Sequence, residues 1–149
     1  MISQLLLAKR LYICGLSYID FPDPVSAGLS ISLFHDSVEL FCWSLLKELD
    51  AKVKENYPFS SFFDLVEKAP KNQDSKNLPL KAKMLELNKA RINFKHYGNL
   101  PDISEAKKFQ GYTEDFLRIS FRDFFKLDFE SISLSQLIPF EEVKSNNIF

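Results

Sequence analysis

The sequence predicts an all-α protein, a compact up-and-down bundle of about five helices. Apolar residues recur at helical spacings of three and four through most of the chain. With 4 glycines and 7 prolines in 149 residues, the chain lacks the turn residues that an all-β sandwich needs. Hydrophobic residues make up 46% of the chain and charged residues 26%, a balance that excludes a chain disordered throughout.

The first two predicted helices are long. The first is expected from about Ser3 to Ile19, where the turn of residues 20–24, with its two prolines, closes it. The second is expected from about Val25 to Val53. Two apolar seams run along it, one of Leu29, Leu33, Leu40 and Trp43, the other of Ile31, Phe34, Val38, Phe41, Leu45 and Leu49. A helix with two seams is covered on more than one side, so we expect this helix at the centre of the bundle.

Three further helices are expected, over about Ser60–Glu67, Leu78–His96 and Ser104–Lys126. Ser60 and Ser104 are candidate caps, because a serine hydroxyl accepts hydrogen bonds from the free N–H groups of a first helical turn. Gly98 and Pro101 stand where a helix that ends at His96 needs its stop signals.

The end of the chain differs from the rest. We expect the bundle to occupy residues 1–130. Residues 131–149 hold a short apolar run, one helical turn in length, before Pro139, and then polar residues. We therefore expect a C-terminal extension, or the start of a linker to a further region of a longer protein.

The net charge of −1 conceals a basic segment. Between Glu67 and His96, eight Lys or Arg stand against three Asp or Glu, a local charge of +5, whereas residues 1–66 and 97–149 carry −3 each. Positive charge gathered on one face binds polyanions such as RNA. A solvated helix rim gives the same charge pattern, so both interpretations stay open.

Cysteine and histidine usage excludes several kinds of site. The chain has 2 Cys and 2 His, none in metal-ligand spacing, so we expect no metal and no cofactor. Cys14 and Cys42 lie in apolar stretches, and we expect both to be buried and reduced, as in a cytoplasmic protein. Lys9 and Arg10 interrupt the apolar N-terminal run, so neither a signal peptide nor a membrane span is predicted.

One arginine occupies an apolar position of the fourth predicted helix. The stripe follows spacings of 4, 3, 4 and 3 and comprises Leu80, Met84, Leu87, Arg91 and Phe94. Asp36 holds the equivalent place on the first seam of the second helix. Because an unpaired buried guanidinium is very costly, we expect Arg91 to pair with Asp36, to be hydrogen-bonded, or to face a water-filled groove.

A histidine ends the same helix. The helix dipole favours the cation of His96, which suits an acid or base near neutral pH, although a lone histidine at a helix end is most often structural. Asn88, Arg91 and Lys95 share one face, a donor-rich strip of the kind that phosphates prefer, and Asn93 lies close in sequence. An arginine that grips a phosphate and a histidine that moves a proton suffice for RNA cleavage without a metal.

The second helix supplies candidate supporting residues. Asp36 or Glu39 is placed to orient Arg91 across the helix pair. His35 lies beside them, and we expect it to be a partly exposed helix residue with no special role.

The stretch Arg91-Ile-Asn-Phe-Lys-His96 resembles the R-x4-6-H signature of the HEPN superfamily, the all-helical "higher eukaryotes and prokaryotes nucleotide-binding" domains. Its surroundings, LNKARINFKHYGNLPD, lie at the end of a late helix, as in that family. The earlier stretch LFHDSVELFCWSLL is similar to the first core helices of prokaryotic members, and FESISLSQLI to the segment that follows the bundle. The resemblance spans about residues 25 to 138.

The resemblance implies a metal-independent endoribonuclease of a toxin–antitoxin or antiviral defence system. In such proteins two bundles pair, so that the Arg and His of both subunits line one cleft. Arg91 would then bind the scissile phosphate and His96 would act as general acid or base, with Asn88, Asn93 and Lys95 contacting single-stranded or looped RNA. For the pairing surface of this homodimer we expect the face formed by Leu78, Leu85 and Ile92.

One residue departs from the family pattern. The family favours a polar residue directly after the arginine, and here that residue is Ile92. Two alternatives therefore stay open beside the endoribonuclease: a non-catalytic dimerisation or interaction domain of a larger protein, and a nucleotide-binding partner of a nucleotidyltransferase. A further partner would be an antitoxin.

Overall fold

The computed structural model describes residues 2–133, and this part is all-helical, without a strand, as predicted. Its α-helices are α1 (Ile2–Leu16), α2 (Pro24–Glu48), α3 (Phe62–Glu67), α4 (Lys81–Tyr97) and α5 (Ile103–Phe125). A single 3₁₀ turn, η1 (Phe59–Ser61), precedes α3. The helical turn expected before Pro139 lies outside the described residues, as does most of the expected extension.

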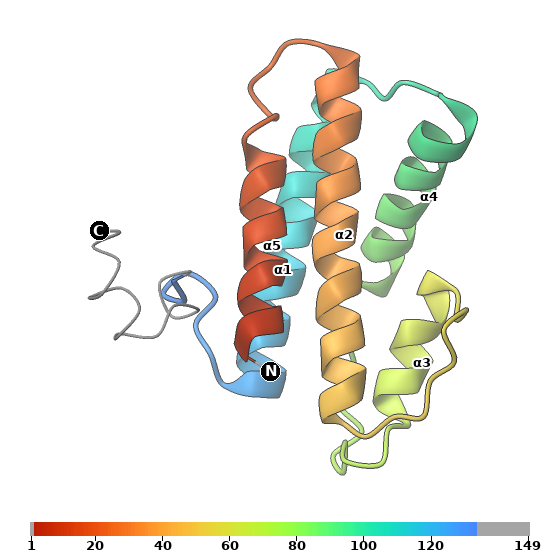
Figure 1. The fold of residues 1–149 in the computed structure, drawn as a ribbon, viewed down its shortest axis with the longest axis vertical. Coiled ribbons are helices and arrows are strands. Elements are labelled where there is room, and N and C mark those ends of the chain that lie inside the picture. The colour runs from red at the N-terminus through yellow and green to blue at the C-terminus, as the bar shows by residue number, and fades with distance from the viewer. Residues whose placement is uncertain (1, 134–149) are drawn as a thin grey trace, which may run out of the picture.

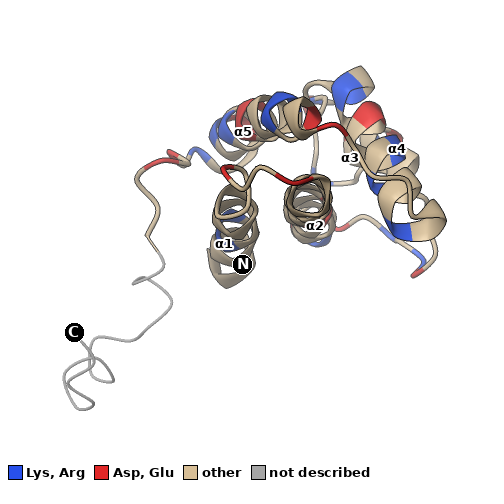
Figure 2. Ribbon diagram, turned by 90° about the horizontal axis from the view of Figure 1, so that it is seen from above, with Lys and Arg blue, Asp and Glu red and all other residues tan. Residues whose placement is uncertain are grey.

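Helix α2 is the central element, as its two seams predicted. It contacts α1 most extensively, and also α5, α4 and α3. Figure 1 shows α1 and α2 side by side with α5 behind them, and the view from above places α2 between α1 and α4 (Figure 2).

Phenylalanine is the most frequent residue type in the core. Phe41 of α2 stacks on Phe121 of α5 at 5.3 Å between ring centroids and meets Phe116 edge-on at 5.9 Å. The buried phenylalanines also include Phe34, Phe59, Phe62, Phe63, Phe109 and Phe129. Most of the chain's aromatic surplus is therefore used within one bundle.

The bounds of α1 and α2 differ from the prediction at their C-terminal ends. Helix α1 ends at Leu16 rather than Ile19, and tight turns follow it. Helix α2 begins at Pro24, where the Asp23 side chain accepts from the Ser26 backbone N–H at 2.8 Å. It ends at Glu48 rather than Val53, because Asp50 adopts a left-handed conformation with φ 55°.

Helix α4 begins three residues later than predicted. Pro79 disfavours a helical conformation for the residue before it, and Leu80 itself is left-handed with φ 58°. Leu78 therefore precedes the helix and is buried in the protein's own core. The pairing face expected from Leu78, Leu85 and Ile92 was consequently wrong as a helical face.

Two predicted caps were also wrong. Helix α5 begins with Asp102, whose side chain accepts from the Ser104 backbone N–H, so Ser104 is a first-turn residue and not the cap. Ser60 lies inside η1, where no side chain caps the turn.

Hydrogen bonds from a lysine of α1 hold the segment that follows α5 against α1. Lys9 of α1 donates to the carbonyl oxygens of Phe129, Glu130 and Ile132 at 2.7 to 3.0 Å. Its ammonium also lies 5.2 Å from the Phe129 ring centroid. The described chain up to residue 133 is thus packed on α1 as part of the bundle.

No helix of the described part is long and apolar enough to cross a membrane. Within residues 2–133, no group of three His, Cys, Asp or Glu side chains could hold a metal ion. Cys42 is buried and free as expected, and burial raises the pKa of its thiol. Cys14 is free but partly exposed, so its predicted burial was wrong.

Candidate phosphate-binding site between α2 and α4

Helices α2 and α4 run antiparallel, and a glycine sets their approach at one end. Gly28 of α2 lies against the ring of Phe94, so close that a Cβ atom on residue 28 would overlap the ring. Farther along α2, His35 meets Asn88, which lies earlier in α4. This register places the middle of α2 opposite the stretch of α4 that carries Arg91.

Arg91 pairs with Asp36, one of the three arrangements expected for it, but the pair is loose. The distance from Arg91 Nε to Asp36 Oδ1 is 3.9 Å, and Asp36 is 39% exposed. A pair of this length and exposure stabilises the fold by about 0–1 kcal/mol. The ion pair therefore lies at the Nε side of the guanidinium but gives Nε no hydrogen bond.

The two sides of the Arg91 guanidinium have different surroundings. Its Nε is buried and makes no hydrogen bond. Its two terminal nitrogens have no partner among the described residues and are not among the buried unpaired atoms, so solvent reaches them. The side chain as a whole is 23% exposed. Arg91 is thus anchored on the inside and free to bind on the outside.

His35 is buried, against the prediction of a partly exposed residue. Only 1% of its surface is accessible, and its ring packs on Phe59 at 4.7 Å between centroids. Its Nε2 donates to Asn88 Oδ1 at 2.8 Å, since that oxygen can only accept. The prediction failed because Asn88 of α4 and Phe59 of η1 together cover the His35 ring.

Burial, more than the neighbouring charges, keeps His35 neutral. Burial, with the positive charges of Arg91 and Lys95, lowers the pKa of His35 to about 4, although the hydrogen bond to Asn88 acts in the opposite sense. Burial also raises the pKa of Glu39, whose carboxylate lies 3.7 Å from His35 Nδ1. Both predicted acids thus interact with Arg91: Asp36 forms an ion pair with it, and the charge of Arg91 acts on the Glu39 carboxylate.

Three of the predicted RNA-binding residues share one face of α4. At about 100° per residue, Asn88 and Lys95 lie about 60° and 40° around the helix from Arg91. Lys95 is exposed and Asn88 partly exposed. The Asn88 side-chain nitrogen donates to no described residue and is not a buried unpaired atom, so it too is a free donor.

His96 and Asn93 do not join this face. Counting the same way, His96 points about 140° and Asn93 about 160° away from Arg91. His96 is exposed in the last turn of α4 and makes no hydrogen bond or ion pair with a described residue. The helix ends one residue later, because Gly98 adopts a left-handed conformation with φ 66°. Within one chain, Arg91 and His96 therefore point toward different sides of α4.

Much of the basic segment is engaged elsewhere. Lys71 pairs with Asp50, Lys76 donates to a backbone carbonyl, and Lys83 lies over the Tyr112 ring at 4.8 Å. Lys81 lies over the Phe63 ring. The charge excess alone is thus a poor guide to a binding face, and Lys95 is the basic neighbour that remains beside Arg91.

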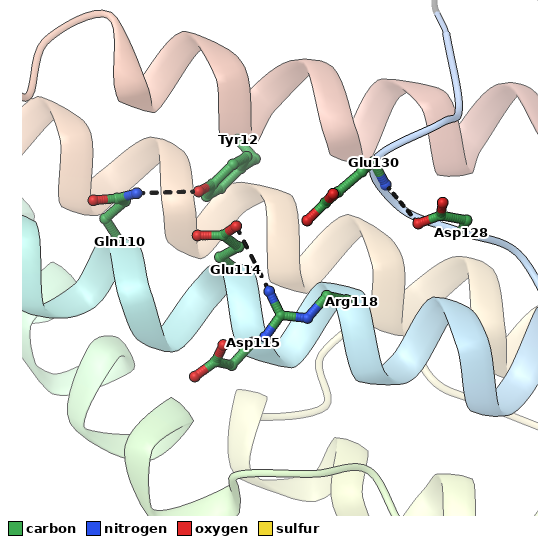
Figure 3. A network of polar contacts seen from close by, with 7 residues as sticks. All are labelled: Tyr12, Gln110, Glu114, Asp115, Arg118, Asp128 and Glu130. Carbon is green, nitrogen blue, oxygen red and sulfur yellow. Dashed lines mark hydrogen bonds and ion pairs between the residues drawn. The ribbon is translucent and has the colours of Figure 1, made fainter.

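A second arginine shows the contrast. Arg118 of α5 pairs with Asp115 at 2.7 Å and with Glu114 at 3.7 Å, within a network of polar contacts that also includes Tyr12 of α1 (Figure 3). Both acids are on its own helix, and the pair leaves no unbalanced positive charge. Two carboxylates therefore balance the charge of Arg118, whereas Arg91 has one carboxylate partner, on its Nε side only.

A third stripe of residues along α2 could have predicted the burial of His35. Residues spaced by 4, 3, 4 and 3 along α2 are small or polar: Gly28, Ser32, His35, Glu39 and Cys42. Two residues of this stripe, Gly28 and His35, face α4. Three buried side-chain atoms without a hydrogen-bond partner belong to this region, namely Ser32 Oγ, His35 Nδ1 and Arg91 Nε. Such a concentration is typical of functional sites rather than of packing.

Comparison with protein-family models, with curated protein sequences and with solved structures found no match to this chain. The site is therefore characterised by its own geometry: an arginine with a buried inner side and free outer nitrogens, two neighbouring donors, and a separate exposed histidine.

Proposed function

We propose that this protein is an RNA-binding protein of HEPN type that cleaves RNA without a metal, at a site composed from two copies of the chain. The observation that carries the proposal is the half-anchored Arg91, whose terminal nitrogens reach solvent beside the free donors Asn88 and Lys95. A toxin or antiviral defence setting in the cytoplasm, with an antitoxin as a further partner, belongs to the same proposal.

The phosphate-binding part follows from donor chemistry. A guanidinium binds a phosphate through two parallel hydrogen bonds, and its inner side must be held so that the outer nitrogens keep their direction. Asp36 provides this support at 3.9 Å, weakly enough to leave the positive charge available. Asn88 adds a neutral donor and Lys95 a second positive charge on the same face of α4.

The cleavage part requires a second copy. In the proposed reaction the ribose 2′-oxygen attacks phosphorus while the bond to the 5′-oxygen breaks, and the two proton transfers are made by histidine acting as base or acid. Because His96 points about 140° away from Arg91 on its own helix, the histidine at each phosphate would come from the other copy. The proposal therefore includes a homodimer.

A non-catalytic interaction domain is the second candidate. Ile92 in place of a polar residue, and the divergence of Arg91 from His96 within one chain, both favour it over an enzyme that acts as a monomer. It predicts RNA or partner binding without cleavage.

Cleavage of a fluorescently labelled single-stranded RNA in the presence of EDTA distinguishes the two. We expect cleavage by the wild type, at least 100-fold slower cleavage by Arg91→Ala and His96→Ala, and unchanged cleavage by the control Arg118→Ala. Cleavage that survives both site substitutions would contradict the assigned residues. Binding without cleavage by a folded dimer would establish the second candidate instead.

A further inference from the structure

His35 is a buried polar residue that a phosphate site at Arg91 does not by itself explain. Its ring is 1% accessible and packs on Phe59 of η1. Within the described residues it makes one hydrogen bond, from Nε2 to Asn88 Oδ1, and its Nδ1 makes none. A ring buried with one unpaired nitrogen costs free energy that an apolar side chain would not. Such a residue calls for a role other than packing.

The hydrogen of the neutral His35 ring belongs on Nε2. The pKa of about 4 keeps the imidazole uncharged near neutral pH, so only one of its nitrogens carries a hydrogen. Nε2 lies 2.8 Å from the Asn88 oxygen, whereas Glu39 Oε2 lies 3.7 Å from Nδ1, beyond hydrogen-bond distance. The ring therefore binds Asn88, and it does so through the amide oxygen.

This hydrogen bond decides which end of the Asn88 amide meets solvent. An asparagine amide has an oxygen that accepts and an NH₂ group that donates, and an unrestrained side chain can present either. With its oxygen bound to the ring, the amide directs its NH₂ group away from His35. That group has no partner among the described residues and is not a buried unpaired atom, so it is open to a ligand.

The open NH₂ group of Asn88 belongs to a side chain that neighbours Arg91. Side chains three residues apart on a helix have Cβ atoms about 5–6 Å apart. Both residues therefore offer N–H donors on one side of α4. The non-bridging oxygens of a phosphodiester only accept hydrogen bonds, so this pair of donors suits one phosphate group. The reverse orientation of the amide would set a carbonyl oxygen against the anion.

We propose that His35 is a positioning residue, which holds the Asn88 NH₂ group beside Arg91 so that both side chains bind one phosphate group of the RNA. The ring does not contact the phosphate and acts through Asn88. The inference deepens the proposed function and rests on its phosphate site, but it needs neither cleavage nor a second copy of the chain.

A double-mutant cycle tests whether His35 acts through Asn88. The fluorescence anisotropy of a labelled single-stranded RNA in EDTA gives its dissociation constant. Asn88→Ala should raise this constant about 10-fold, because a hydrogen bond to the phosphate is lost. His35→Leu should raise it about 5-fold, because an amide that is free to rotate becomes ordered only on binding. The double variant should bind no more weakly than Asn88→Ala alone.

The opposite result of the cycle is equally clear. If the two losses multiply, to about 50-fold in the double variant, His35 acts independently of Asn88 and the inference is overturned. His35→Gln keeps an N–H donor and should bind RNA within about 2-fold of the wild type. The control Leu117→Val destabilises α5 at a fully buried position away from the site and should bind normally. A loss in Leu117→Val as large as that in His35→Leu would also overturn the inference, because destabilisation alone would explain both.

Nuclear magnetic resonance of the ¹⁵N-labelled wild type tests the geometry without any variant. The nitrogen shifts of His35 should report a hydrogen on Nε2. The side-chain NH₂ signals of Asn88 should move together with the guanidinium signals of Arg91 as millimolar inorganic phosphate is added. A hydrogen on Nδ1 instead, or a response of Arg91 without Asn88, would contradict the positioning role.

The two experiments separate this inference from the proposed function. A wild type that shows both phosphate responses but binds no RNA contradicts the proposed function alone. RNA binding that is lost in Arg91→Ala, with multiplying losses in the His35 and Asn88 variants, contradicts the positioning role alone.

Discussion

His35 of α2 donates a 2.8 Å hydrogen bond to Asn88 of α4, and this bond is made by a ring that is almost wholly inaccessible to solvent. It joins the central helix to the helix that carries Arg91 and His96. Because Arg91 lies less than one turn beyond Asn88, the bond also fixes the position of the arginine relative to Asp36.

Replacement of His35 is expected to destabilise the fold, and the loss should be larger when the new side chain has no N–H donor for Asn88. His35→Leu removes the donor and leaves the Asn88 oxygen without its partner, at a cost of about 1–3 kcal/mol. His35→Gln keeps an N–H at a similar distance from the backbone and should cost less. Urea unfolding followed by circular dichroism measures both, and equal losses would show that packing alone matters at this position.

Stability should fall on acidification because of the same residue. The pKa of His35 is about 4 in the folded protein against 6.5 for the free side chain. The unfolded chain therefore binds more protons between these values, and the stability present above pH 6.5 is lost as the pH falls toward 4. The full shift corresponds to about 3 kcal/mol. Glu39, whose pKa is raised, offsets part of this loss as it becomes protonated.

The comparison of wild type with His35→Gln isolates this contribution, since the other titrating groups are common to both. The free energy of unfolding should fall less between pH 7.5 and pH 4.5 in His35→Gln than in the wild type. An equal decline in the two proteins would assign the acid sensitivity to other groups.

Gly28 should tolerate no side chain. Gly28→Ala places a methyl group against the Phe94 ring, and the shift of α4 needed to make room should cost about 1–3 kcal/mol. Gly111 in α5 has open space around its would-be Cβ, so Gly111→Ala is the matched control and should stabilise the protein by about 0.5–1 kcal/mol. Thermal unfolding of the two variants should therefore shift in opposite directions, and a tolerated Gly28→Ala would refute the close approach.

The sequence predicted the helices well and their ends less well. Periodicity is a property of many residues, so the five α-helices and the central role of α2 followed from it. The ends depend on single residues in left-handed conformations. Asp50 and Leu80 are among them; aspartate adopts this conformation more readily than most residues, but leucine rarely does. The late start of α4 transferred Leu78 from an expected surface face to the core.

The candidate site was predictable in part. The Asp36–Arg91 pair followed from two matching interruptions of apolar stripes, because a buried charge needs an opposite charge. The burial of His35 did not follow, since it depends on how α4 and η1 cover a third face of α2. The divergence of Arg91 and His96 could have been read from their spacing, because five residues turn an α-helix by about 140° beyond a full turn.

The central claim is that Arg91 of one copy and His96 of another form one RNA-cleaving site, and subunit mixing tests it most directly. Arg91→Ala and His96→Ala proteins, each inactive alone, are mixed in equal amounts and allowed to exchange subunits. Half of the dimers are then mixed, and each carries one intact site out of two, so cleavage should return to about a quarter of the wild-type rate. Subunit exchange confirmed by fluorescence energy transfer, with no return of RNA cleavage, would contradict the composite site.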